Sequence, residues 1–147
     1  MEVIAHDPFI DAADSDGVRL VDLDEVFSTA DVVSLHAPGG EATLHLVDAA
    51  RLATMRPGAV LVNCARGSLV DQDALLGALE SGQLGGAAPD VTEPEPLPAG
   101  HPLLGREDVG VTPHVASSTA AGRRRLYEHA IDNALAVLEG RPATIVS

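Results

Sequence analysis

The stretch GAVLVNCARGSLVDQDALLGALESG, residues 58–82, decides the fold class. Its first five residues are small or branched apolar residues without polar alternation, and Asn63 closes the run, a pattern typical of a strand that is buried on both faces. A helix is predicted over residues 71–82, because Asp71 can cap its N-terminus and Gly82 stands where helices commonly end. A strand, a short turn and a helix in this order indicate one unit of a parallel sheet.

The same alternation of apolar runs and helical segments continues on both sides of this stretch. Further strands are predicted at residues 2–6, 31–36, 85–91 and 108–114, and further helices at 23–30, 48–55 and 118–139. Pro89 fits poorly in its strand, because proline offers no N–H to a sheet. Helices between parallel strands imply right-handed crossovers. The predicted fold is therefore α/β, with a doubly wound, mostly parallel sheet in one domain over residues 1–147.

Composition narrows the possible functions. The chain carries a formal net charge of −13 and contains no lysine, which argues against non-specific binding to nucleic acid or to anionic membranes. The single cysteine excludes an internal disulfide and a cysteine-based zinc site, and the spacing of the histidines indicates no metal. The sequence predicts neither a signal peptide nor a membrane span, so a cytoplasmic location is the default expectation.

Charged and hydrogen-bonding residues follow the predicted strands, where ligands bind in parallel sheets. Arg66 has a guanidinium that fits a carboxylate, although a surface arginine at a strand exit is the alternative. Glu95 and His114 suggest a carboxylate–imidazole pair that favours a protonated histidine, although each alone is more often solvated or structural. Asp7 suits the hydroxyls of an unphosphorylated ribose or a simple turn, and Cys64 is better explained as a small filler than as a nucleophile.

Three blocks of sequence together resemble one known family. VNCARGSLVDQDALLGALESGQLGGAAPDVTEPEPLP at residues 62–98, followed by VTPHVASST at 111–119, is similar to the cofactor domain of the D-isomer-specific 2-hydroxyacid dehydrogenases. SLHAPGGEATLHLVD at residues 34–48 is similar to the segment that precedes these blocks in the family. The likeness covers nearly all of residues 2–146, with the blocks in the family's order and at its spacing.

The resemblance implies a Rossmann-like fold and an NAD-dependent oxidoreductase that interconverts a small 2-keto acid and a D-2-hydroxy acid. Arg66 would hold the carboxylate of the substrate and polarise its keto oxygen. His114 would donate and accept the proton, with Glu95 as its partner. Cofactor contacts are implied at Asp7 for the ribose, at Asp90 for the nicotinamide carboxamide, and at Thr43, Cys64, Ala65, Arg66, His114, Val115, Ala116 and Ser117.

Parts of the family pattern are missing from these 147 residues, namely the glycine-rich GxGxxG turn with its strand and helix, and the substrate domain. We therefore expect an incomplete sheet, truncated on its N-terminal side, in which residues 2–6 and either 31–36 or 58–63 lack a neighbour. An isolated chain should bind NAD poorly and be weakly active or inactive.

The alternative function is a non-catalytic remnant or an NAD-sensing binding module of the C-terminal-binding-protein type, because those corepressors share the same motifs. The family is commonly dimeric through this domain, so a homodimer is expected. The sequence leaves open which 2-hydroxy acid would be the substrate.

Overall fold

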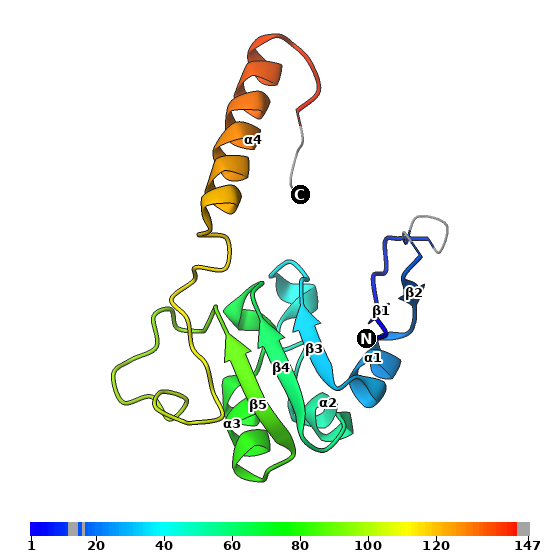
Figure 1. The fold of residues 1–147 in the computed structure, drawn as a ribbon, viewed down its shortest axis with the longest axis vertical. Coiled ribbons are helices and arrows are strands. Elements are labelled where there is room, and N and C mark those ends of the chain that lie inside the picture. The colour runs from blue at the N-terminus through cyan, green and yellow to red at the C-terminus, as the bar shows by residue number, and fades with distance from the viewer. Residues whose placement is uncertain (12–14, 16, 144–147) are drawn as a thin grey trace. The chain divides into compact units, whose positions relative to one another are not determined.

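The computed structural model describes residues 1–11, 15 and 17–143 of the chain. The chain forms two compact units, Met1–His114 and Val115–Ser147. The first unit holds all the strands of the described residues and three α-helices, and the second holds one long helix (Figure 1).

The strands of the first unit form two parallel sheets. β1 (Ile4–Ala5) pairs with β2 (Arg19–Leu20), and β4 (Ala59–Asn63) lies between β3 (Val32–Leu35) and β5 (Leu84–Pro89). Every pairing between these strands is parallel. The predicted α/β class with a parallel sheet is therefore confirmed, whereas the two-residue strand β2 was not anticipated.

Three helices connect these strands, close to where the sequence predicts them. They are α1 (Leu23–Thr29), α2 (Ala49–Thr54) and α3 (Gln72–Glu80), and two short 3₁₀ turns, η2 (Glu41–Thr43) and η3 (Gly67–Leu69), follow β3 and β4. The carboxylate of Asp48 accepts the N–H of Arg51 at 2.9 Å. Asp71 likewise accepts the N–H of Ala74 at 3.1 Å, so both aspartates cap their helices, Asp71 as predicted.

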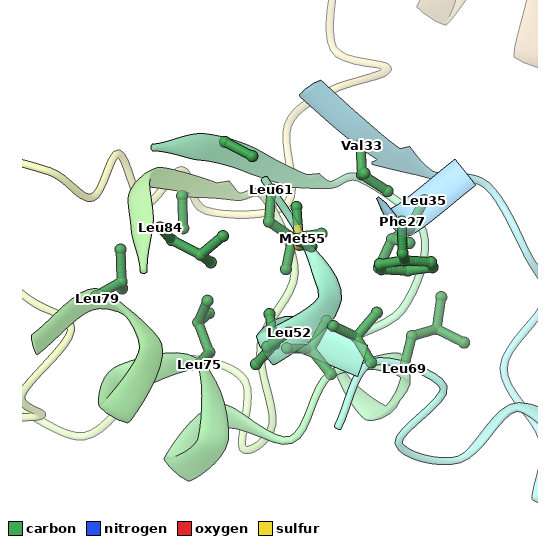
Figure 2. Packing of buried hydrophobic residues seen from close by; sticks show 14 of the residues in the cluster. Phe27, Val33, Leu35, Leu52, Met55, Leu61, Leu69, Leu75, Leu79 and Leu84 are labelled. Carbon is green, nitrogen blue, oxygen red and sulfur yellow. The ribbon is translucent and has the colours of Figure 1, made fainter. Parts of the chain in front are cut away.

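The helices α2 and α3 pack against one face of the larger sheet. Figure 2 shows Leu52 and Leu75 from these helices pointing toward Leu61 of β4. Along β3, only alternate residues are buried, and Val32 is 58% exposed. Burial on both faces, which we expected of the strand at residues 58–63, is therefore not found in β3, because the described residues cover only one of its faces.

β3 also lies at an edge of its sheet. It pairs with β4 alone among the described strands, whereas β4 is paired on both sides. We expected either residues 31–36 or residues 58–63 to lack a neighbour. The structure shows that the edge strand is the one at residues 31–36.

The segment at residues 108–114 does not form the predicted strand. It makes a single bridge, Ala87 with Val109, flanked by hydrogen bonds from the N–H of Gly110 to the oxygen of Ala87 and from the N–H of Thr112 to the oxygen of Pro89. Pro89 and Pro113 provide no N–H, which shortens the ladder.

Pro89 nevertheless leaves the pairing with β4 intact. The oxygen of Pro89 faces Thr112, and the next residue, Asp90, donates its N–H to Asn63 at 2.8 Å. Because successive residues of a strand point their backbone groups to opposite neighbours, the missing N–H lies on the side of residues 108–112. The proline is therefore tolerated within β5.

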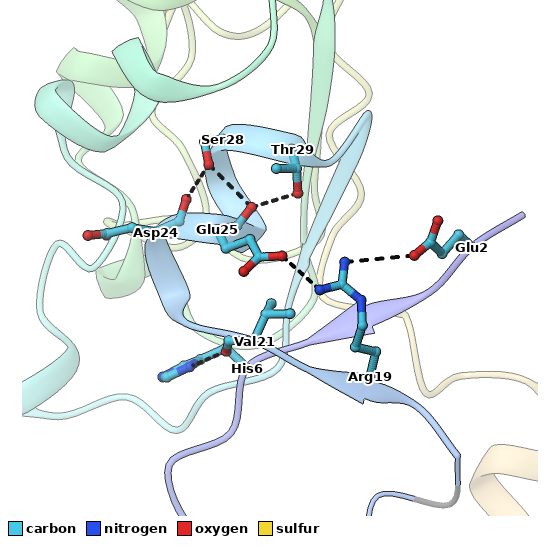
Figure 3. A network of polar contacts seen from close by, with 8 residues as sticks. All are labelled: Glu2, His6, Arg19, Val21, Asp24, Glu25, Ser28 and Thr29. Carbon is cyan, nitrogen blue, oxygen red and sulfur yellow. Dashed lines mark hydrogen bonds and ion pairs between the residues drawn. The ribbon is translucent and has the colours of Figure 1, made fainter. Parts of the chain in front are cut away.

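A surface network attaches the small sheet to α1 (Figure 3). Arg19 of β2 donates to Glu25 of α1 at 2.8 Å and lies 3.7 Å from Glu2. This hydrogen bond to Glu25 raises the pKa of Arg19. His6 contacts the oxygen of Val21 at 3.1 Å, which joins the ends of the two strands.

The second unit contains α4 (Ala120–Leu138), in agreement with the helix predicted at residues 118–139. The hydroxyl of Thr119 accepts the N–H of Gly122 at 2.9 Å and caps its start, and Gly140 follows its end with a φ of +67°. Several apolar side chains of α4 are exposed, namely Leu126, Tyr127, Ile131, Leu135, Val137 and Leu138. No helix of the described residues has the length and apolarity that crossing a membrane requires.

Candidate active site

The carboxyl ends of β3, β4 and β5 lie at one edge of the sheet, and the predicted site residues of the first unit follow these ends or the adjacent segment at residues 108–114. The exception is Asp7, which follows β1 of the smaller sheet. Parallel neighbours make this arrangement unavoidable, because their carboxyl ends all point the same way.

Asn63 shapes the turn that presents Arg66. The side chain of Asn63 is 3% exposed, donates to the oxygen of Arg66 at 2.8 Å and accepts the N–H of Ala65 at 3.1 Å. These two bonds fold residues 64–66 back over the end of β4. The guanidinium of Arg66 is exposed and donates to the oxygen of Ala65 at 2.7 Å.

The loop after β3 contacts the side-chain stem of Arg66. A Cβ at Gly39 would lie 2.9 Å from Cγ of Arg66, so no larger residue fits there without movement. The stem is therefore held between two strand ends, while its charged head remains accessible to a solute.

Asp90 connects three segments at the end of β5. It is buried, and its N–H donates to the backbone oxygen of Asn63 at 2.8 Å. Its carboxylate accepts the hydroxyl of Thr112 at 2.5 Å, and its backbone oxygen accepts the N–H of His114 at 2.9 Å. The backbone of His114 is thus anchored to the strand that ends at Asp90.

His114 and Glu95 form the pair that the sequence predicts. Nδ1 of His114 lies 2.7 Å from Oε1 of Glu95. Because an ionised carboxylate can only accept a hydrogen bond, the proton lies on Nδ1 and the pair leaves Nε2 of the imidazole for another partner. The side chains of His114 and Glu95 are 52% and 40% exposed, so a dissolved substrate can reach them.

The backbone of His114 adopts an unusual conformation, with a φ of +53°. This left-handed region favours glycine and costs a residue with a Cβ about 1–2 kcal/mol. Such outliers persist where neighbouring structure holds them, here the hydrogen bond from the N–H of His114 to the oxygen of Asp90 and the pair with Glu95.

The structure brings together Glu95 and His114, and it places Arg66 at the end of the neighbouring strand. Between the guanidinium of Arg66 and either partner, the described residues show no hydrogen bond. Asn63 and Thr112 orient the site, yet neither was proposed from the sequence as a functional residue. Their only signal was a polar side chain at the end of an apolar run.

The residues implied in cofactor binding occupy several of these strand ends. Asp7 is exposed after β1 and accepts the N–H of Phe9 at 2.8 Å, and Thr43 donates to the oxygen of Pro38 at 2.7 Å. Cys64 is exposed and Ala65 half-buried at the end of β4. The second unit begins with Val115, Ala116 and Ser117. Their contribution to cofactor binding therefore stays a prediction.

Within the described residues, no group of three or more histidine, cysteine, aspartate or glutamate side chains could hold a metal ion. The arrangement instead provides an imidazole hydrogen-bonded to a carboxylate, and an exposed guanidinium after the end of β4. Such a set can transfer a proton to an oxygen atom and stabilise negative charge that develops there.

Comparison with known proteins identifies one family. Residues 1–116 match the family model described as "D-isomer specific 2-hydroxyacid dehydrogenase, NAD binding domain". An (S)-sulfolactate dehydrogenase of Chromohalobacter salexigens is 46% identical over 136 residues, which are 90% of this chain and 44% of that protein. A glyoxylate reductase of Thermofilum pendens is 44% identical over 131 residues, covering 88% of this chain and 39% of that protein.

A solved structure extends the similarity to three dimensions. The D-lactate dehydrogenase of Lactobacillus jensenii with NAD⁺ superposes with a TM-score of 0.86 at 30% sequence identity. The match covers 99% of this chain and 48% of that one. The chain therefore spans less than half the length of these relatives.

Proposed function

The chain belongs to the D-isomer specific 2-hydroxyacid dehydrogenase family through its NAD-binding domain, and on this premise we propose that it is the cofactor-binding part of an NAD-dependent oxidoreductase. The reaction would interconvert a small 2-keto acid and a D-2-hydroxy acid. The observation that carries the proposal is the 2.7 Å hydrogen bond between His114 and Glu95, close to the strand end that bears Arg66.

The residues at the sheet edge fit a nicotinamide dinucleotide in their chemistry. Cys64 and Ala65 have short side chains, so a flat ring can approach the backbone at the end of β4. Asp90 would receive the carboxamide, and Asp7 would bind the hydroxyls of an unphosphorylated ribose. Thr43, His114, Val115, Ala116 and Ser117 would complete the contacts.

The bound NAD would supply or accept the hydride. In the reducing direction, protonated His114 would donate the proton on Nε2 to the keto oxygen, while Nδ1 stays bonded to Glu95. The carboxylate of Glu95 would stabilise the positive imidazolium before this transfer. In the oxidising direction, the neutral imidazole would accept the hydroxyl proton at Nε2.

Arg66 would bind and orient the substrate. A guanidinium offers a planar fork of N–H donors that matches a carboxylate. One arm would hold the carboxylate, and the positive charge would stabilise the oxygen as it becomes negative. The exposed guanidinium of Arg66 is available for this role.

We also propose that the protein works as a cytoplasmic homodimer, with residues 1–147 belonging to one cofactor domain. The resemblance to the family supports the dimer, and the free Cys64 fits a reducing compartment.

The test is NADH oxidation by the full gene product in the presence of glyoxylate, hydroxypyruvate, pyruvate or 3-sulfopyruvate. Turnover of at least one keto acid that is lost in His114→Asn is expected. Tight NADH binding in calorimetry without turnover of any 2-keto acid would instead favour the non-catalytic binding module. If the protein showed no turnover and bound no NADH, both the enzyme and the binding module would be refuted.

A further inference from the structure

The loop that carries Glu95 is attached to the beginning of α3. Nε2 of Gln72, the first residue of that helix, donates a hydrogen bond to the backbone oxygen of Glu93. The cap provided by Asp71 fixes where the helix starts, and therefore where the side chain of Gln72 begins. One amide thus links a rigid helix end to a loop residue two positions before Glu95.

The other end of the same amide is buried without a partner. Oε1 of Gln72 is shielded from solvent and accepts no hydrogen bond from the described residues. Gln72 also lines a cavity of about 10 Å³, together with Asn63, Gly67 and Val91, which is at the lower limit of the space that one water molecule needs. Burial of an unsatisfied carbonyl oxygen is unfavourable. Space filling alone therefore does not account for glutamine at this position, whereas the bond to Glu93 does.

A second contact holds the same loop. A Cβ added at Gly67 would overlap the backbone oxygen of Thr92, so the turn after β4 lies directly against the start of the loop. Within the loop, the hydroxyl of Thr92 donates to Pro94 at 2.9 Å, and its N–H lies 3.4 Å from Oε2 of Glu95. Any movement of residues 92–94 would therefore displace the carboxylate of Glu95.

We propose that Gln72 is a positioning residue for the pair of His114 and Glu95. By holding the oxygen of Glu93, it keeps the loop at residues 92–96 in the conformation that brings Glu95 within 2.7 Å of the imidazole. The effect of Gln72 on turnover rests on the function proposed above. The geometry of the pair can be tested without turnover.

The experiment is a long-range ¹H–¹⁵N NMR spectrum of the histidine rings in the 147-residue chain, at one fixed pH near neutrality. The Nδ1 signal of His114, assigned with His114→Asn, reports its hydrogen bond to a carboxylate. Glu95→Gln provides the reference for a broken pair. Gln72→Met removes the donor at nearly constant volume. The matched control is Gln83→Met, since Gln83 also donates Nε2 to a backbone oxygen, that of Met55 at 2.7 Å.

The expected result is that Gln72→Met shifts the Nδ1 signal most of the way toward its position in Glu95→Gln, while Gln83→Met leaves it in place. An unchanged signal in Gln72→Met, with a clear shift in Glu95→Gln, would overturn the proposal. An unchanged signal in Glu95→Gln would overturn it as well, because no pair would then exist to be positioned.

A shift in Gln72→Met with no turnover of any keto acid would sustain the positioning role while the proposed function fails. Circular dichroism confirms that each variant folds. Where Gln72→Met does not fold, Gln72→Glu serves as the second variant, since ionised glutamate keeps the shape and lacks the donor.

Discussion

The bond between His114 and Glu95 assigns different tasks to the two nitrogens of one ring. Nδ1 is engaged with the carboxylate, so Nε2 is the atom from which a proton can leave. In the proposed function, the carboxylate would act on the reaction through the imidazole, and the guanidinium of Arg66 would act on the substrate directly. Variants of the two charged partners should therefore fail in different ways.

In Glu95→Gln, the neutral amide no longer stabilises an imidazolium. We expect kcat/KM for the keto acid to fall about 10²-fold, at the lower end of the range for general acid–base catalysis. Steady-state kinetics of NADH oxidation measures the effect. Glu80→Gln, at the C-terminal end of α3, serves as the control and should retain the wild-type rate. Equal rates in Glu95→Gln and wild type would contradict the role of the pair.

In Arg66→Lys, the positive charge is kept but the planar fork is lost. We expect the loss of one charge-assisted hydrogen bond, about 1.5–3 kcal/mol, which lowers kcat/KM about 10–100-fold, mainly through a higher KM. Arg56→Lys is the matched control, because Arg56 binds Asp31 on the surface at 2.7 Å. A variant with unchanged KM would show that Arg66 does not hold the carboxylate.

The candidate site residues lie at strand ends and in the turns that follow them. These segments pack so closely that one added methyl group should destabilise the fold. Gly67→Ala would force a methyl group against the oxygen of Thr92. We expect the free energy of unfolding to fall by about 1–3 kcal/mol, as for other overpacked positions. Urea denaturation monitored by circular dichroism measures the change.

Gly77→Ala provides the opposite control. Gly77 lies inside α3, and a Cβ there meets no atom within 4 Å. Alanine is therefore expected to stabilise the protein by about 0.5–1 kcal/mol. Destabilisation by both variants to the same degree would show that the contact with Thr92 is not the cause.

The turn before residues 109–114 is held by a two-bond ion pair. Nε and Nη2 of Arg106 each donate to the carboxylate of Asp108 at 2.8 Å, and this lowers the pKa of Asp108 from its ordinary value of 3.8. A lowered pKa in the folded state means that the carboxylate stabilises the fold above pH 3.8. The contribution disappears as the pH falls through the lowered pKa.

Asp108→Asn is therefore expected to lower Tm at neutral pH, with a difference from wild type that shrinks as the pH drops below 3.8. Thermal unfolding at a series of pH values measures it. Asp31→Asn, which removes a pair on the exposed surface, should change Tm less. A difference that grows toward acid pH would contradict this sign.

Much of this arrangement could be predicted because its signals are local. Apolar runs and the caps Asp48 and Asp71 mark the strands and helices, and the direction of parallel strands places Glu95 and His114 at one edge. The bridge at Val109, the two-residue β2 and the bond from Gln72 to Glu93 depend on how distant segments pack. Neither periodicity nor residue type carries that information. The strand predicted at 108–114 failed because two prolines limit its ladder.

The chain as a whole combines regions of very different expected stability. β4 is paired on both sides and packed against helices, whereas α4 exposes many apolar side chains and β1 pairs over two residues only. Amides in β4 should therefore exchange with deuterium at least about ten times more slowly than those in α4 or β1. Mass spectrometry of exchange on the isolated chain measures this. Equal protection of α4 and β4 would show that another surface covers α4.

The left-handed backbone at His114 has a consequence for anyone who redesigns this protein. Glycine at this position would relax the main chain, so a search that rewards melting temperature alone would replace the imidazole to which the proposed function gives the proton transfer. At residue 114, thermal stability and the proposed proton transfer therefore favour different amino acids. Mutant libraries selected for thermal stability should therefore keep His114 and vary other positions, for instance Gly77.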